Sequence, residues 1–423
     1  MLGGSLPSLH DVPPGRVPAG VLLREGIGSE QSTTMSKRTL HFVVGRTILV
    51  YVILSFCYRS VVLGEETDPE AAQARPRHVF IVVLENQGFE TTFGKNSPAP
   101  YLSRNLAPKG LLLRQYYGIG HFSLDNYIAM VSGQGPNPYT QNDCLTYYDF
   151  RPLVNGLDPN GQALGAGCVY PEVVRTIANQ LDDKHLTWKG YMEDMHASCE
   201  HPVLGQFDNH IRASKESQYA TRHNPFVYFH SIIDHPTCAE HVVALTQLDH
   251  DLQAVAQTPN LAFITPNLCN DGHDRASDIC EGGQLISADR FLRPLVSKIL
   301  ASAAYQRDGM LIITFDEADI DVKGGKVVAE QTDSTACCNE PTGPNTVAPG
   351  QTGPGGGRTG TLIISKYVRP GCDDHPYNHY ALLRSLEDLF GLDHLGFAAQ
   401  AGLKPFGDDV YHKSRPCRDE ERN

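Results

Sequence analysis

The chain has 423 residues, 41% of them apolar and 20% charged, a composition typical of globular proteins that excludes wholesale disorder. Its formal net charge is −13, and because residues 1–64 carry six Lys or Arg against three Asp or Glu, the remainder carries −16. A surface of that sign repels nucleic acid, so we expect no nucleic-acid partner. Any site that binds an anion must obtain its positive charge locally, from a metal ion or from backbone N–H groups.

Residues 1–64 are predicted to form an N-terminal extension that ends in a signal peptide. Three basic residues, Lys37, Arg38 and Arg46, precede an apolar run at 48–58. Residues 62–64 follow this run and offer a candidate cleavage site with small residues. The run is too short to cross a bilayer, so we expect no stable membrane span. The protein is therefore predicted to be secreted or periplasmic, with an uncleaved signal anchor as the alternative.

Cysteine usage agrees with export. One of the eleven cysteines, Cys57, lies in the apolar run, and the other ten predict up to five disulfides. Metal ligation is the competing interpretation, but the chain has no C-x-x-C pair. Cys337 and Cys338 are adjacent, and we expect each of them to bond a separate partner.

Residues 65–77 are predicted to be a polar linker, and residues 78–423 a single α/β domain. Four apolar runs are typical of buried strands, and four stretches have helical patterns. Strands that alternate with helices predict a layered fold with a mostly parallel central sheet. The expected strands are 78–84, 260–265, 309–315 and 359–365, the expected helices are 172–184, 239–256, 288–302 and 379–390, and a long loop is expected at 322–358.

Acidic and amide side chains follow three of the expected strands. Glu85 and Asn86 follow the first, the stretch 270–274 (Asn-Asp-Gly-His-Asp) follows the second, and Asp316 and Glu317 follow the third. Chemistry in such folds collects at the carboxyl ends of strands. A single acidic residue there is often a helix cap, but three such clusters indicate a site.

The stretch 120–133 (GHFSLDNYIAMVSG) is predicted to place Ser123 at the start of a buried helix. Exposed N–H groups and the positive end of the helix dipole make that position favourable for a phosphoryl group. Taken alone, the stretch favours a serine that only caps the helix.

Seven blocks of the sequence, in order, resemble the phosphoesterase family that contains bacterial phospholipases C and secreted acid phosphatases, a family of the alkaline-phosphatase superfamily. The resemblance implies an alkaline-phosphatase-like three-layer α/β sandwich. The blocks are His78–Gly94, Pro100–Leu102, His121–Gly133, Gly190–Asp194, Pro266–Asp274, Ile312–Asp319 and His379–Leu392.

The resemblance also implies roles for individual residues. Ser123 matches the nucleophile and Asn126 the amide that holds a phosphoryl oxygen, while His121 or His273 is expected to protonate the leaving group. The implied ligands of a divalent cation are Glu85, Asn86, Ser123, Asp271, Asp274, Asp316, Glu317 and His379. Because this set is rich in carboxylates, it favours one hard ion (Mg²⁺, Mn²⁺ or Ca²⁺) over two Zn²⁺ ions.

The sequence thus predicts an exported, metal-dependent phosphoesterase that acts through a phosphoserine intermediate. Phosphate monoesters of the acid-phosphatase type are the first expectation, with phosphoinositides among them, so the partner is a small phosphate ester or a phospholipid headgroup. A phospholipase C-like phosphodiesterase is the alternative. A non-catalytic exported binding protein is a third hypothesis.

Overall fold

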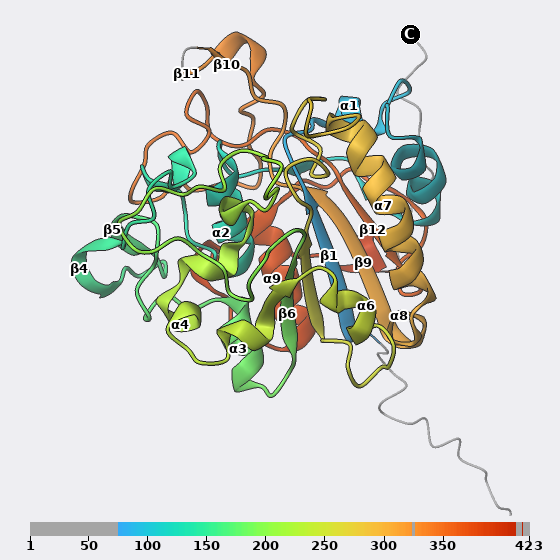
Figure 1. Ribbon diagram of the computed structural model, residues 1–423, viewed down its shortest axis with the longest axis horizontal. Coiled ribbons are helices and arrows are strands. Elements are labelled where there is room, and N and C mark those ends of the chain that lie inside the picture. The colour runs from blue at the N-terminus through green and yellow to red at the C-terminus, as the bar shows by residue number, and fades with distance from the viewer. Residues whose placement is uncertain (1–74, 324–325, 412–416, 418–423) are drawn as a thin grey trace, which may run out of the picture. The chain divides into compact units, whose positions relative to one another are not determined.

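The computed structural model describes residues 75–323, 326–411 and 417. The predicted signal peptide and most of the predicted linker lie outside these residues. The described part is built on an eight-stranded sheet with the order β13-β2-β12-β9-β1-β8-β6-β7 (Figure 1). Its strands are β1 (His78–Leu84), β2 (Leu111–Leu113), β6 (Trp188–Met192), β7 (Val242–Ala244), β8 (Leu261–Thr265), β9 (Gly309–Phe315), β12 (Thr361–Ser365) and β13 (Gly371–Asp373).

The sheet is mostly parallel, as predicted. β1 pairs in parallel with both β8 and β9, and β6 continues the parallel run to β7. Only β12 opposes its neighbours, since it is antiparallel to β9 and to β2. The four strands expected from apolar runs are all present, and every residue of β1 and β9 is buried because helices cover both faces of the sheet.

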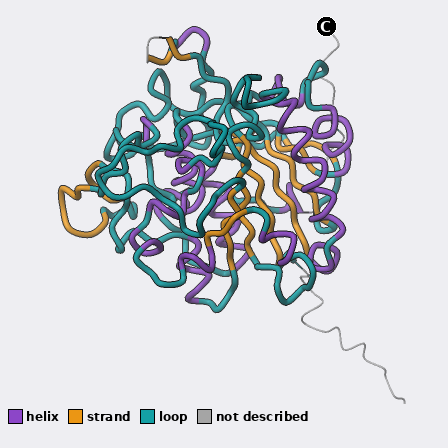
Figure 2. Tube along the Cα trace, in the orientation of Figure 1, coloured by secondary structure: helices purple, strands orange, loops and turns teal. Residues whose placement is uncertain are grey.

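Alternate side chains of β1 enter two separate cores. Val79, Ile81 and Val83 pack with the helices α2 (Ser123–Ser132), α3 (Ile177–Asp183) and α9 (His379–Phe390). Phe80, Val82 and Leu84 pack with α7 (Gln284–Ala301) on the other face. Figures 1 and 2 show α7 and α2 on opposite sides of the strands, which confirms the three-layer sandwich.

The prediction of a single helix at 239–256 is wrong. That stretch forms α5 (Cys238–His241), then β7, then α6 (Gln247–Asp251). Val242 and Val243 are β-branched residues that favour extended backbone, and they extend the sheet by pairing with Gly190 and Tyr191 of β6. Their extended conformation thus depends on pairing with the edge of the sheet, which the local pattern of apolar residues does not reveal.

The remaining elements are short, apart from the hairpin of β4 and β5. They are α1 (Phe89–Phe93), β3 (Tyr116–Tyr117), β4 (Arg151–Leu157), β5 (Ala163–Ala166), α4 (His230–Ile233), α8 (Ala303–Asp308), β10 (Val322–Lys323), β11 (Lys326–Val327), β14 (Tyr377–Asn378) and α10 (Asp408–Tyr411). No helix within 75–323 or 326–411 is long and apolar enough to cross a membrane.

The ten cysteines after the predicted signal peptide form disulfides, in agreement with the expected number of five. The pairs are Cys144–Cys168, Cys199–Cys238, Cys269–Cys280, Cys337–Cys338 and Cys372–Cys417. The expectation that Cys337 and Cys338 bond separate partners is wrong, because they bond each other. They lie in a tight turn in which Cys338 (φ 67°) and Asn339 (φ 53°) both have left-handed backbone, and this turn brings the two sulfur atoms together.

Candidate functional site

The three polar clusters predicted after strands meet at one edge of the sheet. Glu85 follows β1, Asp271 follows β8 and Asp316 follows β9, and these strands are neighbours in the sheet. The Glu85 N–H donates to the Asp271 carbonyl (2.9 Å), and the Asp316 N–H donates to the Leu84 carbonyl (2.9 Å). Backbone pairing therefore continues past the strand ends and fixes the three clusters side by side.

Ser123 is the first residue of α2, and its hydroxyl donates to Glu85 Oε2 (2.7 Å). The Tyr127 hydroxyl, one turn later, donates to Glu85 Oε1 (2.5 Å). Phe122 holds the N-cap position and makes no side-chain capping bond. Ser123 thus presents its hydroxyl to a buried carboxylate instead of capping its helix.

An acidic side chain, Asp143, already accepts a hydrogen bond from a backbone N–H at the start of α2. The Leu124 N–H donates to Asp143 Oδ1 (3.1 Å), so this helix N–H is not left for an anion as the sequence had suggested. Asp143 Oδ2 in turn lies 3.5 Å from Nε of Arg222. The positive charge of the protein near Ser123 therefore comes from a guanidinium group.

The clusters after β1 and β9 are joined by hydrogen bonds. The Asn86 N–H donates to Asp316 Oδ1 (2.9 Å), and Asn86 Nδ2 donates to Glu317 Oε1 (2.8 Å). His121 Nδ1 pairs with Glu317 Oε2, and His121 Nε2 pairs with the Asp333 carbonyl (3.0 Å). Both ring nitrogens of His121 are thus engaged, and Nδ1 holds Glu317 beside Asn86.

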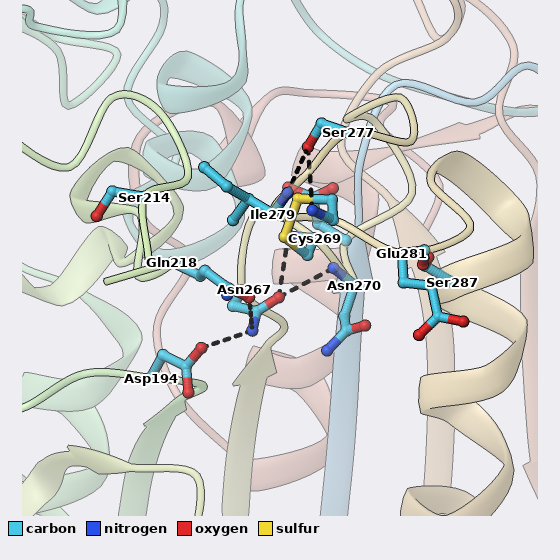
Figure 3. The surroundings of a disulfide bond; sticks show 12 residues. Asp194, Ser214, Gln218, Asn267, Cys269, Asn270, Ser277, Ile279, Glu281 and Ser287 are labelled. Carbon is cyan, nitrogen blue, oxygen red and sulfur yellow. Dashed lines mark hydrogen bonds between the residues drawn. A yellow bond between two sulfur atoms is a disulfide. The ribbon is translucent and has the colours of Figure 1, made fainter. Parts of the chain in front are cut away.

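The loop after β8 carries Asp271 and is braced from its base, as Figure 3 shows. Asn267 Oδ1 accepts from the N–H groups of Cys269 (3.0 Å) and Asn270 (3.0 Å), and Asn267 Nδ2 donates to Asp194 Oδ2 (2.7 Å). The Cys269–Cys280 disulfide closes the loop. Within it, Asp271 Oδ1 accepts from the His273 N–H (2.9 Å), while the side chains of His273 and Asp274 are partly exposed.

Two residues with implied direct roles make structural hydrogen bonds. His379 Nδ1 pairs with the Tyr116 hydroxyl (3.0 Å) and Nε2 with the Asp316 carbonyl, so His379 supports the backbone beneath Asp316. Asn126 Oδ1 accepts from the N–H groups of Ile119 (2.7 Å) and Gly120 (3.1 Å). Asn126 Nδ2 donates to the carbonyls of Gly120 (3.0 Å) and Phe122 (3.1 Å), which holds the turn that leads into Ser123.

Sequence reasoning missed His223, which lies between two of the acidic clusters. Its Nε2 is 3.4 Å from Glu85 Oε2, its Nδ1 is 3.8 Å from Asp271 Oδ2, and its ring stacks on Tyr127 (centroids 5.4 Å apart). The residue is 1% exposed, and neither ring nitrogen hydrogen-bonds to a described residue. His223 and the neighbouring Arg222 follow no apolar strand, so no local pattern marks them.

The site concentrates negative charge where water is excluded. Burial raises the pKa of Glu85, and burial together with the charge of Glu85 raises the pKa of Asp271 and Asp316. Burial, followed by the charge of Arg222, lowers the pKa of His273 to about 4, and the pKa of His223 also falls. Burial alone would lower the pKa of Arg222, but Asp143 and the site carboxylates outweigh it and raise that pKa.

The oxygens of this cluster suit a hard cation. Asn86 Oδ1, Asp271 Oδ2 and Asp316 Oδ2 are buried without a hydrogen-bond partner among the described residues. Buried polar atoms seldom stay unpaired, and carboxylate and amide oxygens are the ligands that Mg²⁺, Mn²⁺ and Ca²⁺ prefer. The residues present therefore fit one such ion.

A second group of ligand-type side chains lies elsewhere and was not predicted. Oxygen and nitrogen atoms of Asp373, His375 and Asp409 lie within 4.8 Å of one another, at the edge strand β13. Asp409 Oδ2 already pairs with Lys404 and accepts from the Tyr377 hydroxyl (2.6 Å). Lys404 therefore offsets the charge of Asp409.

A family model described as the Phosphoesterase family matches residues 95–393, a range that begins after Glu85 and Asn86. A "Phosphate-repressible acid phosphatase" of Penicillium chrysogenum is 30% identical over 74% of this chain and 58% of its own length. A "Phosphatidylinositol-3-phosphatase" of Mycobacterium tuberculosis is 25% identical over 78% of this chain and 83% of its own length.

The chain spans only 55–59% of the length of three fungal acid phosphatases that it matches. Among solved structures, "a Protein in the Alkaline Phosphatase Superfamily" from Vibrio parahaemolyticus aligns with a TM-score of 0.47 and 14% identity. That alignment covers 79% of this chain and 71% of the other.

Proposed function

The chain belongs to the Phosphoesterase family, and from this premise we propose that it hydrolyses phosphate monoesters with Ser123 as the nucleophile. The hydrogen bond of 2.7 Å from the Ser123 hydroxyl to Glu85 carries the proposal. A serine hydroxyl is a weak nucleophile until a neighbouring group accepts its proton, and a carboxylate within hydrogen-bond reach is such a group. The acid phosphatases among the relatives support monoesters as the substrates.

In the proposed reaction, Ser123 Oγ attacks phosphorus as the bond to the leaving oxygen breaks. The hydroxyl proton passes to Glu85, and the leaving oxygen takes a proton from the protonated form of His273, whose ring is partly exposed and whose pKa of about 4 populates that form at acidic pH. Water then gives a proton to His273 and attacks phosphorus, the bond from phosphorus to Ser123 Oγ breaks, and Oγ recovers its proton from Glu85 as phosphate departs. Arg222 offers its charge to the equatorial oxygens.

We propose that Glu85, Asn86, Asp271 and Asp316 hold a single Mg²⁺, Mn²⁺ or Ca²⁺ ion. Such an ion lowers the pKa of an adjacent hydroxyl and offsets the charge of the phosphoryl group. Among the other implied ligands, Glu317 and His379 position Asn86 and Asp316 through the contacts described above. Asp274 is partly exposed at the mouth of the site.

We further propose that the protein is exported and that phosphoinositides are among its substrates. Export is supported by the five disulfides, because such bonds persist in oxidising compartments. Phosphoinositides are proposed among the substrates, supported by the mycobacterial relative that is named for one.

The test compares hydrolysis of p-nitrophenyl phosphate and bis-p-nitrophenyl phosphate, with and without a chelator. We expect a chelator-sensitive preference for the monoester. Ser123→Ala should lower kcat by about a thousandfold or more with an unchanged circular dichroism spectrum. Ser132→Ala is the matched control, since Ser132 ends the same helix and its hydroxyl donates to the Ile128 carbonyl (2.7 Å).

Three other outcomes would contradict the proposed function. Full activity of Ser123→Ala would reject the serine nucleophile. Preference for the diester would replace the phosphatase with a phospholipase C-like phosphodiesterase. No turnover of either compound by folded, cation-loaded protein would leave a non-catalytic binding protein.

A further inference from the structure

Exposed apolar side chains are concentrated on one part of the described surface. Nine of the twelve large exposed apolar residues fall in the stretches 139–157 and 203–207. We call these nine the apolar rim: Tyr139, Leu145, Tyr148, Leu153, Val154, Leu157, Val203, Leu204 and Phe207. Scattered apolar residues are ordinary on a soluble protein, whereas a cluster of this kind marks an interaction surface.

Backbone pairing places the two stretches side by side. Thr146 and Phe207 form an antiparallel bridge, and the Asp208 N–H donates to the Leu145 carbonyl (3.0 Å). The rings of Tyr139 and Tyr148 lie 6.0 Å apart. The rim continues into the hairpin of β4 and β5, at the left edge of Figure 1, where all seven residues of β4 are exposed and Leu153 is 82% exposed.

The rim is attached directly to the proposed active site. Asp143, two residues before Leu145, accepts from the Leu124 N–H at the start of α2. Asp208, next to Phe207, accepts from the Thr221 hydroxyl (3.1 Å), and Thr221 adjoins Arg222 and His223. The same segments therefore both support the surroundings of Ser123 and present exposed apolar side chains.

Cations lie along the path between the rim and the site. The segment 208–218 runs from Phe207 to the loop after β8, where the Leu268 N–H donates to the Gln218 carbonyl (2.9 Å). Arg212 and Lys215 on this segment are exposed and form no ion pair with a described residue, and Arg212 is near enough to Asp274 to lower the pKa that burial raises. Glu216 is the acidic side chain exposed there. Arg151 adds a cation on β4 itself.

We propose that the apolar rim docks on the surface of a lipid bilayer, so that a phosphorylated lipid headgroup reaches Ser123 past Arg212 and Lys215. This inference rests on the proposed function. A chain with a net charge of −16 outside residues 1–64 should avoid anionic membranes, but apolar side chains flanked by cations fit the boundary between headgroups and acyl chains. A second copy of the chain is the rival occupant.

The test is flotation of the full-length protein with phosphatidylcholine vesicles that contain a minor fraction of phosphatidylinositol 3-phosphate. Leu153→Asp should weaken vesicle binding by about tenfold, because one buried apolar side chain contributes an effect of that order. Phosphate release from the vesicles should fall in parallel, while hydrolysis of soluble p-nitrophenyl phosphate stays unchanged. Phe207→Asp tests the other half of the rim in the same way.

Val347→Asp is the matched control, because Val347 is 92% exposed and lies outside the rim. All variants share residues 1–74, so a difference between them cannot come from that segment. Equal vesicle binding by wild type, Leu153→Asp and Phe207→Asp would overturn the proposal, as would a change of oligomeric state in place of lost vesicle binding. Inactivity of the wild type towards p-nitrophenyl phosphate would reject the proposed function, yet flotation would still decide the docking surface.

Discussion

At the scale of single residues, the most informative side chain is His223. An imidazole buried with both nitrogens unpaired is costly, because each has lost its bonds to water without replacement. Burial, and then the charge of Arg222, lowers its pKa, so the ring is neutral while it faces Glu85 and Asp271. A neutral imidazole beside the carboxylate that receives the Ser123 proton is able to exchange that proton or to bind substrate.

We therefore expect His223→Asn to lower kcat/KM for p-nitrophenyl phosphate by about a hundredfold, the lower range for loss of a proton-transfer group. Steady-state kinetics measures the effect. His235→Asn serves as the control, since the His235 side chain is exposed and hydrogen-bonds to Thr237 nearby. Unchanged kcat/KM in folded His223→Asn protein would show that the histidine only fills space.

At the scale of elements, the site depends on loops that follow rigid strands. Three buried strands bring their carboxyl ends together, but the loop after β8 must also turn Asp271 back towards Glu85. Asn267 and the Cys269–Cys280 disulfide fix that turn, and Figure 3 shows Asn267 and Cys269 at the base of the loop. The Cys199–Cys238 disulfide, in contrast, joins a turn after β6 to α5, and the Cys199 N–H donates to the Val242 carbonyl (2.8 Å).

Loss of the Cys199–Cys238 disulfide should therefore lower stability more, and loss of the Cys269–Cys280 disulfide should lower activity more. Cys199 and Cys238 are 39 residues apart and Cys269 and Cys280 are 11 apart, so replacing each pair with serine should cost about 4 and about 3 kcal/mol of unfolding free energy, respectively. The shorter loop carries Asp271, so its loss should reduce activity and cation affinity more. Denaturant titration and kinetics on both double variants test this expectation. A larger loss of activity in the Cys199/Cys238 variant would contradict it.

At the scale of the whole molecule, a strongly acidic chain has gathered several carboxylates in a buried place. The pKa of Glu85, Asp271 and Asp316 is raised above the ordinary value near 4, so folding favours their protonated forms. That contribution to stability is complete below pH about 4 and is lost as the pH rises through the folded-state pKa values. A bound divalent cation would stabilise the charged carboxylates and so oppose the burial, and the charge of Glu85 on its neighbours, that raise these pKa values.

In a chelator, we accordingly expect the unfolding temperature to fall as the pH is raised from about 4 towards neutrality. Added Mn²⁺ or Mg²⁺ should raise the unfolding temperature again. The gain in unfolding free energy should be about 2.7 kcal/mol when the ion is present at a hundred times its dissociation constant. Calorimetry at several pH values provides the measurement. In Asp316→Asn the cation-dependent gain should shrink, and an equal gain in that variant would place the ion elsewhere.

The sequence alone predicted the central strands, the α/β class and the acidic residues that follow three of those strands. It could do so because a strand buried on both faces must be a continuous apolar run, and because parallel strands end at a common edge. Ser123 at the start of a helix was likewise visible from its own neighbours. These features depend on residues close together in the chain.

How those side chains are used depends on contacts that exist only in the folded chain. Glu85 meets Ser123 and His223 across separations of 38 and 138 residues, and no local pattern encodes such contacts. Asp143 occupies a helix N–H that the sequence had left for an anion, and a free sheet edge turned Val242 and Val243 from helix to strand. The apolar rim likewise exists only because two distant stretches pair, since burial and pairing are set by the whole fold.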